Sequence, residues 1–196
     1  MHLSSLHKMK DFKEKHLKDL MGKEIKILDL GSQDVNGSYK TIFDVPGWHY
    51  IGVDAAPGKN VDVILTSPYN WSQFARSSID VIISGQAFEH IDFFWLTVLE
   101  MRRVLKDDGI CCIIAPSSGP EHRYPVDCWR FYPDGLTAMA AFGGLKPLEV
   151  YTQWNDDTDY TDGSNIWHDS VLIAKKANLG FWRDFKLSLA SVFLRP

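Results

Sequence analysis

Two carboxylates stand beside short apolar runs in the N-terminal part of the chain. Asp29 lies in a run that leads into Gly31 and Ser32, and Asp54 ends a second run further along. In a parallel sheet, a glycine-containing turn after a strand lets a nucleotide-like cofactor lie across the carboxyl edge of the strands. An acid at the tip of the neighbouring strand can accept hydrogen bonds from both ribose hydroxyls. These four residues predict a site for an adenosine.

Two histidines are placed for acid–base chemistry. His90 follows the apolar run 79–84, and His122 lies in a polar stretch after the run 110–115. Loops at the carboxyl ends of strands face the ligand in open α/β sheets. A histidine near its ordinary pKa of about 6.5 can take a proton from a reacting hydroxyl. Either residue is a candidate general base, although His90 could instead orient the helix that follows it.

The elements that must position these residues alternate along the chain between helical spacing and continuous apolar runs. This alternation predicts an α/β fold, a doubly wound, Rossmann-like sheet that is mostly parallel, with helices on both faces. The last two strands are separated by a long polar connection and should form an antiparallel pair at the C-terminal edge. Helices are expected over 5–20, 92–105 and 136–142, with a short one over 38–43, and strands over 25–30, 50–53, 62–65, 79–84, 110–115, 149–154 and 170–174.

The size of the chain favours one domain followed by a tail. At 196 residues and 45% hydrophobic composition it can bury one sizeable core. Residues 1–178 are expected to form that domain, with an N-terminal helix in 1–21 that caps the cofactor side. Residues 179–196 form an amphipathic tail. We expect it to dock on its own domain or on a second copy in a homodimer, and peripheral contact with a membrane surface is the alternative.

The bulk composition argues against several classes of partner. A net charge of −4 and a pI near 5.9 disfavour nucleic acid, which needs a basic surface. No apolar run is long enough to span a bilayer. The adjacent Cys111 and Cys112 point to opposite sides of a strand and cannot form an ordinary local disulfide, so reduced thiols and a cytoplasmic location fit best. No Cys/His spacing predicts zinc.

Four segments, in this order and spacing, give a resemblance to class I S-adenosylmethionine-dependent methyltransferases over roughly residues 22–176. The segment 29–32, Asp-Leu-Gly-Ser, resembles the first motif of that family, and Asp54 its ribose-binding acid. Residues 80–91, which include a Glu-His pair, are similar to the fourth-strand motif. Residues 100–109 resemble the helix and turn before the fifth strand.

The resemblance implies S-adenosylmethionine as the cofactor. The segment 120–135 is also similar to part of methyltransferase-domain proteins associated with polysaccharide or natural-product biosynthesis, and we expect Arg123 and Tyr124 in it, with Phe88, to bind the acceptor. Gln86 stands where related metal-binding O-methyltransferases have an acid, so no metal is expected. The cofactor-binding residues implied are Asp29, Gly31, Ser32, Gln33, Asp54, Ala55, Thr66, Ser67 and Gln86.

Methyl transfer in the family that this chain resembles requires little covalent catalysis by the protein. Methyl transfer from a sulfonium mainly needs in-line placement of the nucleophile in a partly desolvated pocket. A general base is required only when the acceptor is a hydroxyl or a protonated amine. The histidine-bearing loop and the subgroup favour O-methylation of a small molecule or sugar over N-methylation, with His122 or His90 as the base.

Two departures from the family pattern leave other functions open. Gln33 and Asp34 occupy part of a loop that is commonly glycine-rich, and Thr66 and Ser67 stand where an acid often receives adenine. These changes keep a methyltransferase-like binding subunit without catalysis as an alternative. A nucleotide-dependent oxidoreductase is a third hypothesis, disfavoured because the loop lacks the G-x-G-x-x-G spacing.

Overall fold

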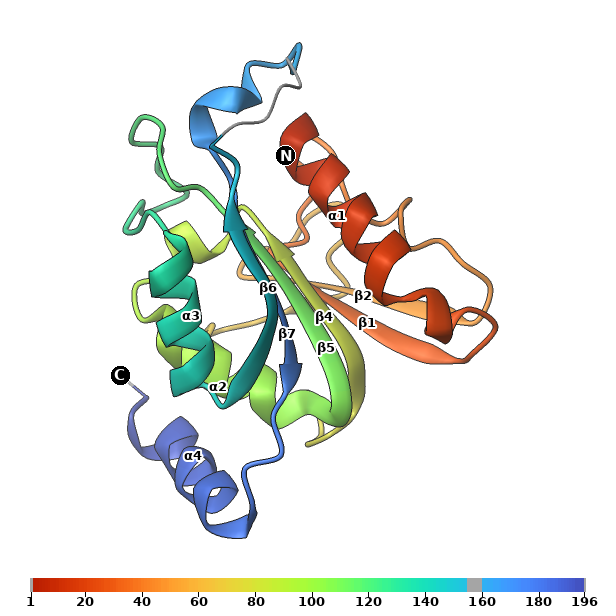
Figure 1. Ribbon diagram of the computed structural model, residues 1–196, viewed down its shortest axis with the longest axis vertical. Helices are drawn as coiled ribbons and strands as arrows, with labels where there is room; N and C mark the ends of the chain where they lie inside the picture. Colours follow the sequence, from red (N-terminus) through yellow and green to blue (C-terminus); the bar gives the residue numbers. More distant parts are fainter. Residues whose placement is uncertain (1, 155–159, 196) are drawn as a thin grey trace.

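The computed structural model describes residues 2–154 and 160–195 and contains a seven-stranded sheet in the order β3-β2-β1-β4-β5-β7-β6 (Figure 1). The strands from β1 to β5 pair in parallel, and β7 runs antiparallel to both of its neighbours. This confirms the predicted mostly parallel sheet with an antiparallel C-terminal pair. The strands are β1 (Ile25–Leu30), β2 (Trp48–Asp54), β3 (Val63–Ile64), β4 (Ile79–Gly85), β5 (Leu105–Ala115), β6 (Leu145–Thr152) and β7 (Ser170–Lys176).

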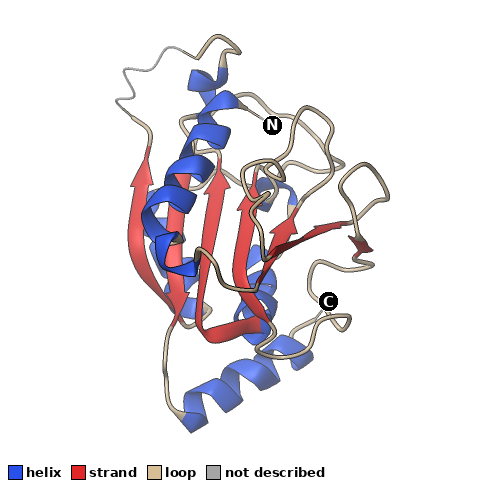
Figure 2. Ribbon diagram, turned by 90° about the vertical axis from the view of Figure 1, so that its right-hand side faces the viewer, coloured by secondary structure: helices blue, strands red, loops and turns tan. Residues whose placement is uncertain are grey.

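Helices cover both faces of the sheet, as predicted (Figures 1 and 2). The helix α1 (Leu3–His16) packs over one face, and α2 (Phe94–Val104) and α3 (Pro133–Phe142) pack over the other. The helix α4 (Phe181–Phe193) lies against α2. None of the described helices is long and apolar enough to cross a membrane.

The central strands are buried on both faces, which explains their continuous apolar runs. On the α1 side, Phe12 belongs to the same buried cluster as Ile83 of β4. The preceding residue, Ile82, lies in the cluster under α2 and α3. Cys111 and Cys112 of β5 are divided between the two clusters in the same way, and both are buried and free. The predicted opposite orientation of these two thiols is confirmed.

The short helix predicted over 38–43 is wrong. This stretch forms turns, in which the Ile42 amide donates to the Tyr39 oxygen at 2.8 Å and the Phe43 amide to the Lys40 oxygen at 3.2 Å. The side chains of Tyr39 and Phe43 are fully buried in the cluster on the α1 side. Two buried aromatic rings therefore fix the connection between β1 and β2 against the sheet without a helix.

Gly85, at the end of β4, leaves the space that Tyr39 fills. A Cβ atom on Gly85 would lie 1.8 Å from the Tyr39 hydroxyl oxygen. We expect Gly85→Ala to lower the free energy of unfolding by about 1–3 kcal/mol through overpacking, as measured by urea denaturation. Tyr39→Phe removes the clashing oxygen, so adding it to Gly85→Ala should recover part of the loss.

Gly135 in α3 provides the matched control, because a Cβ there meets nothing within 4 Å. In a helix interior, alanine is favoured over glycine by about 1 kcal/mol. Gly135→Ala should therefore be neutral or stabilising. If both substitutions destabilise the protein equally, the contact between Gly85 and Tyr39 is not the cause.

The C-terminal helix docks on its own domain (Figure 1). The Arg102 guanidinium donates to the Asp184 carboxylate and to the Gly144 oxygen, and Arg195 lies 3.2 Å from the Glu100 carboxylate. Contact of α4 with a second copy or with a membrane surface stays a prediction, which rests on the apolar outer side of the helix. The exposed apolar side chains on it include Phe181, Trp182, Val192 and Phe193.

Candidate functional site

The loops that follow β1, β2, β4 and β5 meet at the carboxyl edge of the sheet. These four strands are neighbours in the order β2-β1-β4-β5 and run parallel, so their carboxyl ends lie on the same side. Most of the predicted cofactor residues lie in or directly after β1, β2 and β4, whereas Thr66 and Ser67 follow β3. His122 lies in the loop after β5. The topology thus brings together residues that are far apart in the sequence.

Asp54, at the tip of β2, ties two of these loops together. One carboxylate oxygen accepts the Gln33 amide at 3.0 Å, and the other accepts the Ala55 amide at 2.7 Å. A carboxylate oxygen has capacity for more than one hydrogen bond. Asp54 can therefore hold the loop after β1 and still accept two hydroxyl groups from a ribose.

Gly31 brings the loop after β1 against the loop after β4. Its φ is +83°, and a Cβ atom there would lie 2.6 Å from the Cβ of Ala87. Both the conformation and the space require glycine. The predicted adenosine site at the carboxyl edge of β1 and β2 therefore borders the segment that carries Glu89 and His90.

The two side chains that depart from the glycine-rich pattern bind the loop after β2. The side-chain Nε2 of Gln33 donates to the backbone oxygen of Pro57 at 3.3 Å. The Asp34 carboxylate lies 2.6 Å from the Lys59 ammonium and accepts the Gly37 amide at 2.8 Å. These residues thus act as ties between loops, a role that a glycine could not fill.

Asp29 is a buried acid in β1 with one free oxygen. The Tyr50 hydroxyl donates to its Oδ2 atom, whereas Oδ1 is buried and has no hydrogen-bond partner. Burial raises the pKa of Asp29 to about 7, against the hydrogen bond from Tyr50, which favours the ionised form. The free oxygen can accept a hydrogen bond from a cationic donor.

Gln86 links the loop after β4 to the N-terminal turn of α1. Its side-chain nitrogen donates to Asp169 Oδ1 at 2.9 Å, and the Ser4 hydroxyl donates to Asp169 Oδ2 at 2.6 Å. The Gln86 side-chain oxygen is buried without a partner. Sequence reasoning missed Asp169, because it lies just before β7 and carries no motif. This contact places the N-terminal turn of α1 beside the loop after β4, and a capping role of α1 over a bound cofactor stays a prediction.

Glu89, His90 and His122, from the loops after β4 and β5, form a compact cluster at the carboxyl edge of the sheet. One ligand-type atom from each residue lies within 4.8 Å of the other two. The Glu89 carboxylate is 3.6 Å from His90 Nε2, and the His90 and His122 rings meet edge to face with centroids 4.9 Å apart. The two histidines singled out from the sequence are thus neighbours, although they belong to different loops.

The protonation of this cluster follows from burial. Neither oxygen of the fully buried Glu89 has a hydrogen-bond partner, and burial raises its pKa to about 8. Burial also lowers the pKa of His90, although a hydrogen bond to the Val126 oxygen opposes that shift. His90 Nδ1 lies 2.6 Å from this carbonyl oxygen. Since a carbonyl only accepts, Nδ1 carries the hydrogen and Nε2 of the neutral ring has a lone pair.

Asp127 holds the loop after β5 in place. It accepts two hydrogen bonds from Arg130, at 2.6 and 2.8 Å, and the backbone amide of His122 at 2.7 Å. The Arg130 hydrogen bonds hold the pKa of Asp127 well below its usual range. This is the internal Asp–Arg pair that the spacing of the two residues suggests. Its carboxylate also lies 3.4 Å from His122 Nδ1.

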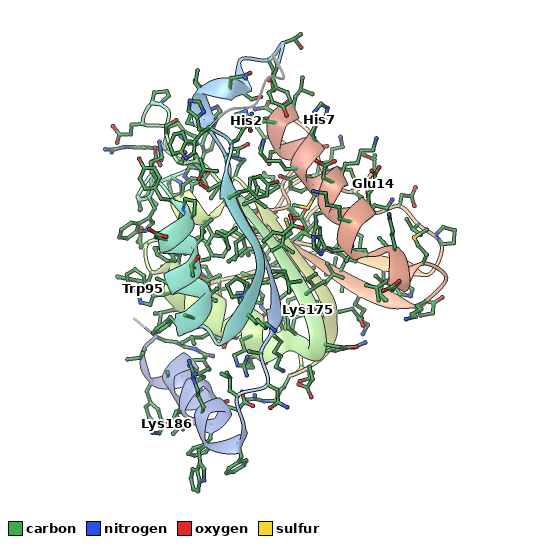
Figure 3. The ribbon with its side chains drawn as sticks, viewed as in Figure 1. His2, His7, Glu14, Trp95, Lys175 and Lys186 are labelled. Carbon is green, nitrogen blue, oxygen red and sulfur yellow. The ribbon has the colours of Figure 1, made fainter. Side chains whose placement is uncertain are left out.

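Aromatic side chains surround the histidine cluster. Tyr124 is 66% exposed, and its ring centroid lies 6.4 Å from that of His122. The ring centroid of Trp167 lies 4.7 Å from that of His122. The Trp167 ring also stacks on His2, which Figure 3 labels beside the N-terminal end of α1. No sequence signal identified Trp167. Arg123 points to solvent in an ion pair with Glu121 at 2.7 Å.

Several predicted site residues lie apart from these groups. Phe88 is fully buried and packs edge-on against Phe131 in the core, away from Arg123 and Tyr124 on the exposed loop. Ala55 and Thr66 are exposed. The Ser67 and Ser32 hydroxyls take part in local hydrogen bonds, to the Tyr69 amide at 3.2 Å and the Asn60 oxygen at 3.0 Å.

Comparison with known proteins gives a family match and a distant relative. Residues 28–113, from β1 to β5, match the family model described as Methyltransferase domain. An uncharacterized methyltransferase of Mycolicibacterium gilvum (strain PYR-GCK) is 25% identical over 187 residues, which cover 88% of this chain and 66% of that protein. The chain therefore spans slightly less than two thirds of the length of this relative.

Two solved structures share the fold. One is the 1,6-didemethyltoxoflavin-N1-methyltransferase of Burkholderia thailandensis with bound 1,6-didemethyltoxoflavin and S-adenosylhomocysteine, with a TM-score of 0.67 at 14% identity over 89% of this chain and 79% of that one. The other is a methyltransferase in complex with the Haloferax volcanii Trm112 methyltransferase activator, with a TM-score of 0.61 at 14% identity over 88% and 95%.

Proposed function

We propose that the chain is a class I S-adenosylmethionine-dependent methyltransferase with S-adenosylmethionine as its cofactor, and that it methylates a hydroxyl group of a small molecule or sugar. The family match over residues 28–113 and the shared fold support the first part of this proposal. The observation that carries this proposal is the meeting of His90 and His122, with ring centroids 4.9 Å apart, beside the contact between Gly31 and Ala87. A proton acceptor next to the cofactor edge is what a hydroxyl acceptor needs.

The residues at the carboxyl edge fit the cofactor. Asp54 would accept the ribose hydroxyls, and the bare backbone of Gly31 leaves room that a side chain would fill. The unpartnered Oδ1 of Asp29 would accept the ammonium group of the methionine moiety. S-adenosylmethionine supplies a methyl group on a positively charged sulfur. The protein then has to place the acceptor in line with it and exclude water.

His122 is the better placed of the two candidate bases. Its side chain is partly exposed, whereas Nδ1 of His90 is already bonded to the Val126 oxygen. Asp127 lies 3.4 Å from His122 Nδ1 and would stabilise the positive ring formed when a proton is taken up. Tyr124 and Arg123 on the same loop would contact the acceptor, with the tyrosine ring as a stacking surface for a sugar.

His122→Ala tests the proposal. A general base contributes about 10²–10⁴-fold to a rate. We therefore expect the variant to form S-adenosylhomocysteine at least about 100-fold more slowly with an acceptor found by screening nucleotide sugars and phenols. Its affinity for S-adenosylhomocysteine, measured by calorimetry, should stay unchanged.

His49→Ala is the matched control, since His49 pairs with Glu24 on the exposed surface. It should leave both turnover and affinity unchanged. Equal turnover in wild type and His122→Ala would show that His122 is not the general base. A protein that binds no S-adenosylhomocysteine would instead favour the non-catalytic binding subunit suggested by Gln33, Asp34 and Thr66.

A further inference from the structure

The Glu89 carboxylate has no hydrogen-bond partner among the described residues. It is fully buried, and neither of its oxygens accepts a hydrogen bond from the described part of the chain. Buried polar groups are ordinarily hydrogen-bonded, and buried charges are paired or coordinate a metal. The His90 and His122 rings each offer a ligand-type atom within 4.8 Å of this carboxylate. The arrangement therefore lacks a positive group that would sit between the three side chains.

The orientation of His90 supports a metal as that group. Its Nδ1–H donates to the Val126 oxygen at 2.6 Å, which leaves the Nε2 lone pair 3.6 Å from the Glu89 carboxylate. Histidines that bind metals almost always donate their other ring N–H to a carbonyl or carboxylate in this way.

His122 completes the set from a different loop. Its Nδ1 atom is buried and makes no hydrogen bond within the described residues, and the Asp127 carboxylate, 3.4 Å away, accepts the His122 backbone amide and so holds this part of the loop. Two imidazoles and one carboxylate are a donor set that suits zinc and similar first-row metals, whereas magnesium prefers oxygen ligands.

We propose that Glu89, His90 and His122 bind one divalent transition-metal ion of the zinc type, with a remaining coordination position open to an oxygen of the acceptor. Ligand distances of about 2.0–2.2 Å place donor atoms on the order of 3.4 Å apart in a tetrahedral site. The atoms here lie within 4.8 Å of one another, so the loop that carries His122 has to close by about 1 Å.

This inference replaces the sequence-based expectation that no metal binds. That expectation rested on Gln86, which stands where an acid would be a ligand, and the Gln86 side chain does bond to Asp169 instead. In the structure the third ligand comes from the loop after β5, which no local sequence pattern could bring to Glu89. Binding itself is independent of the proposed function.

A role for the ion rests on the proposed function. Because Ala87 borders Gly31, the ion would lie on the acceptor side of the cofactor edge. It would bind the acceptor oxygen and lower the pKa of that hydroxyl. His122 would then act as a ligand and not as the base, and the acceptor hydroxyl would lose its proton to solvent water while its oxygen stays bound to the ion.

Calorimetric titration of the tag-free, chelator-treated full chain with Zn²⁺ tests the site. We expect one ion per chain, with micromolar or tighter affinity, and visible absorption bands of low-symmetry coordination when Co²⁺ is used instead. Glu89→Gln and His122→Ala should each weaken binding at least tenfold. His49→Ala, which alters a surface His–Glu pair, should bind as wild type does.

Folding is checked by S-adenosylhomocysteine affinity, which should be the same in all four proteins. Absence of stoichiometric Zn²⁺ binding in the wild type would overturn the metal site. So would affinity that is unchanged by Glu89→Gln and His122→Ala. A metal-free wild type that still needs His122 for turnover would refute this inference and leave the proposed function standing.

Discussion

Replacing Asp54 by alanine is expected to weaken binding of S-adenosylhomocysteine by at least about 100-fold, or about 3 kcal/mol. Two ribose hydroxyls would lose a charged acceptor, and hydrogen bonds to charged groups contribute about 1.5–3 kcal/mol each. The carboxylate also holds the Gln33 amide at 3.0 Å, so the loop after β1 loses a tie. Calorimetry measures the change, with NAD as a ligand that should not bind wild type.

Asp62→Ala controls for the structural part of this effect. Asp62 also caps a backbone group, the Gly52 amide at 2.8 Å, but it does not lie at the tip of β2. We expect its substitution to leave the affinity for S-adenosylhomocysteine within a few-fold of wild type. If Asp62→Ala weakens binding as much as Asp54→Ala, the loss reflects loosened loops and not a ribose contact. Wild-type affinity in Asp54→Ala would refute the assignment.

The meeting of Gly31 and Asp54 at one edge of the sheet could be predicted from the sequence because the position of each residue is local to its strand. Asp54 ends a strand, and Gly31 follows one, so a parallel sheet places both at the same edge whatever the rest of the chain does. The antiparallel final pair could be foreseen in the same way, from two late strands with a long connection. The wrong helix over 38–43 shows the limit of local reasoning, because buried rings of Tyr39 and Phe43 decide that segment.

The acceptor side of the site depends on contacts that no local pattern encodes. His122 could be suspected from its polar loop, but its distance to His90 depends on how the loop after β5 folds. Trp167 and Asp169 enter from the turn before β7, far along the chain, and carry no motif. That the Glu89 carboxylate is buried without a hydrogen bond from the described residues can be learned only from the structure.

Asp29 is expected to make the stability of the protein fall as the pH rises from about 4 to 7. Burial raises its pKa from 3.8 to about 7 in the folded protein. In this window the folded state keeps a proton that the unfolded state releases, so a rise in pH favours unfolding. Each pKa unit corresponds to 1.36 kcal/mol, so the loss amounts to about 4 kcal/mol and levels off above pH 7.

Asp29→Asn removes this titration while keeping the shape of the side chain. Urea denaturation of both proteins between pH 4.5 and 8 gives the difference in unfolding free energy at each pH. We expect wild type to lose about 3 kcal/mol relative to Asp29→Asn between pH 4.5 and 8, since all other titrating groups cancel in the difference. Parallel curves would mean that the carboxyl group keeps its ordinary pKa in the folded protein.

Tyr50→Phe and bound S-adenosylhomocysteine should shift the dependence of the unfolding free energy on pH in opposite directions. The Tyr50 hydroxyl donates to the Asp29 carboxylate and favours the ionised form, so its removal should shift the window to higher pH. If the ammonium group of S-adenosylhomocysteine lies against the free Oδ1 atom, saturating ligand pairs the carboxylate and should lower its pKa. The loss of stability between pH 4.5 and 7 should then shrink in the ligand-bound protein. If the unfolding free energy still falls with pH at saturating S-adenosylhomocysteine, the ammonium group does not lie against Asp29. That result would leave the ribose contact of Asp54 untouched.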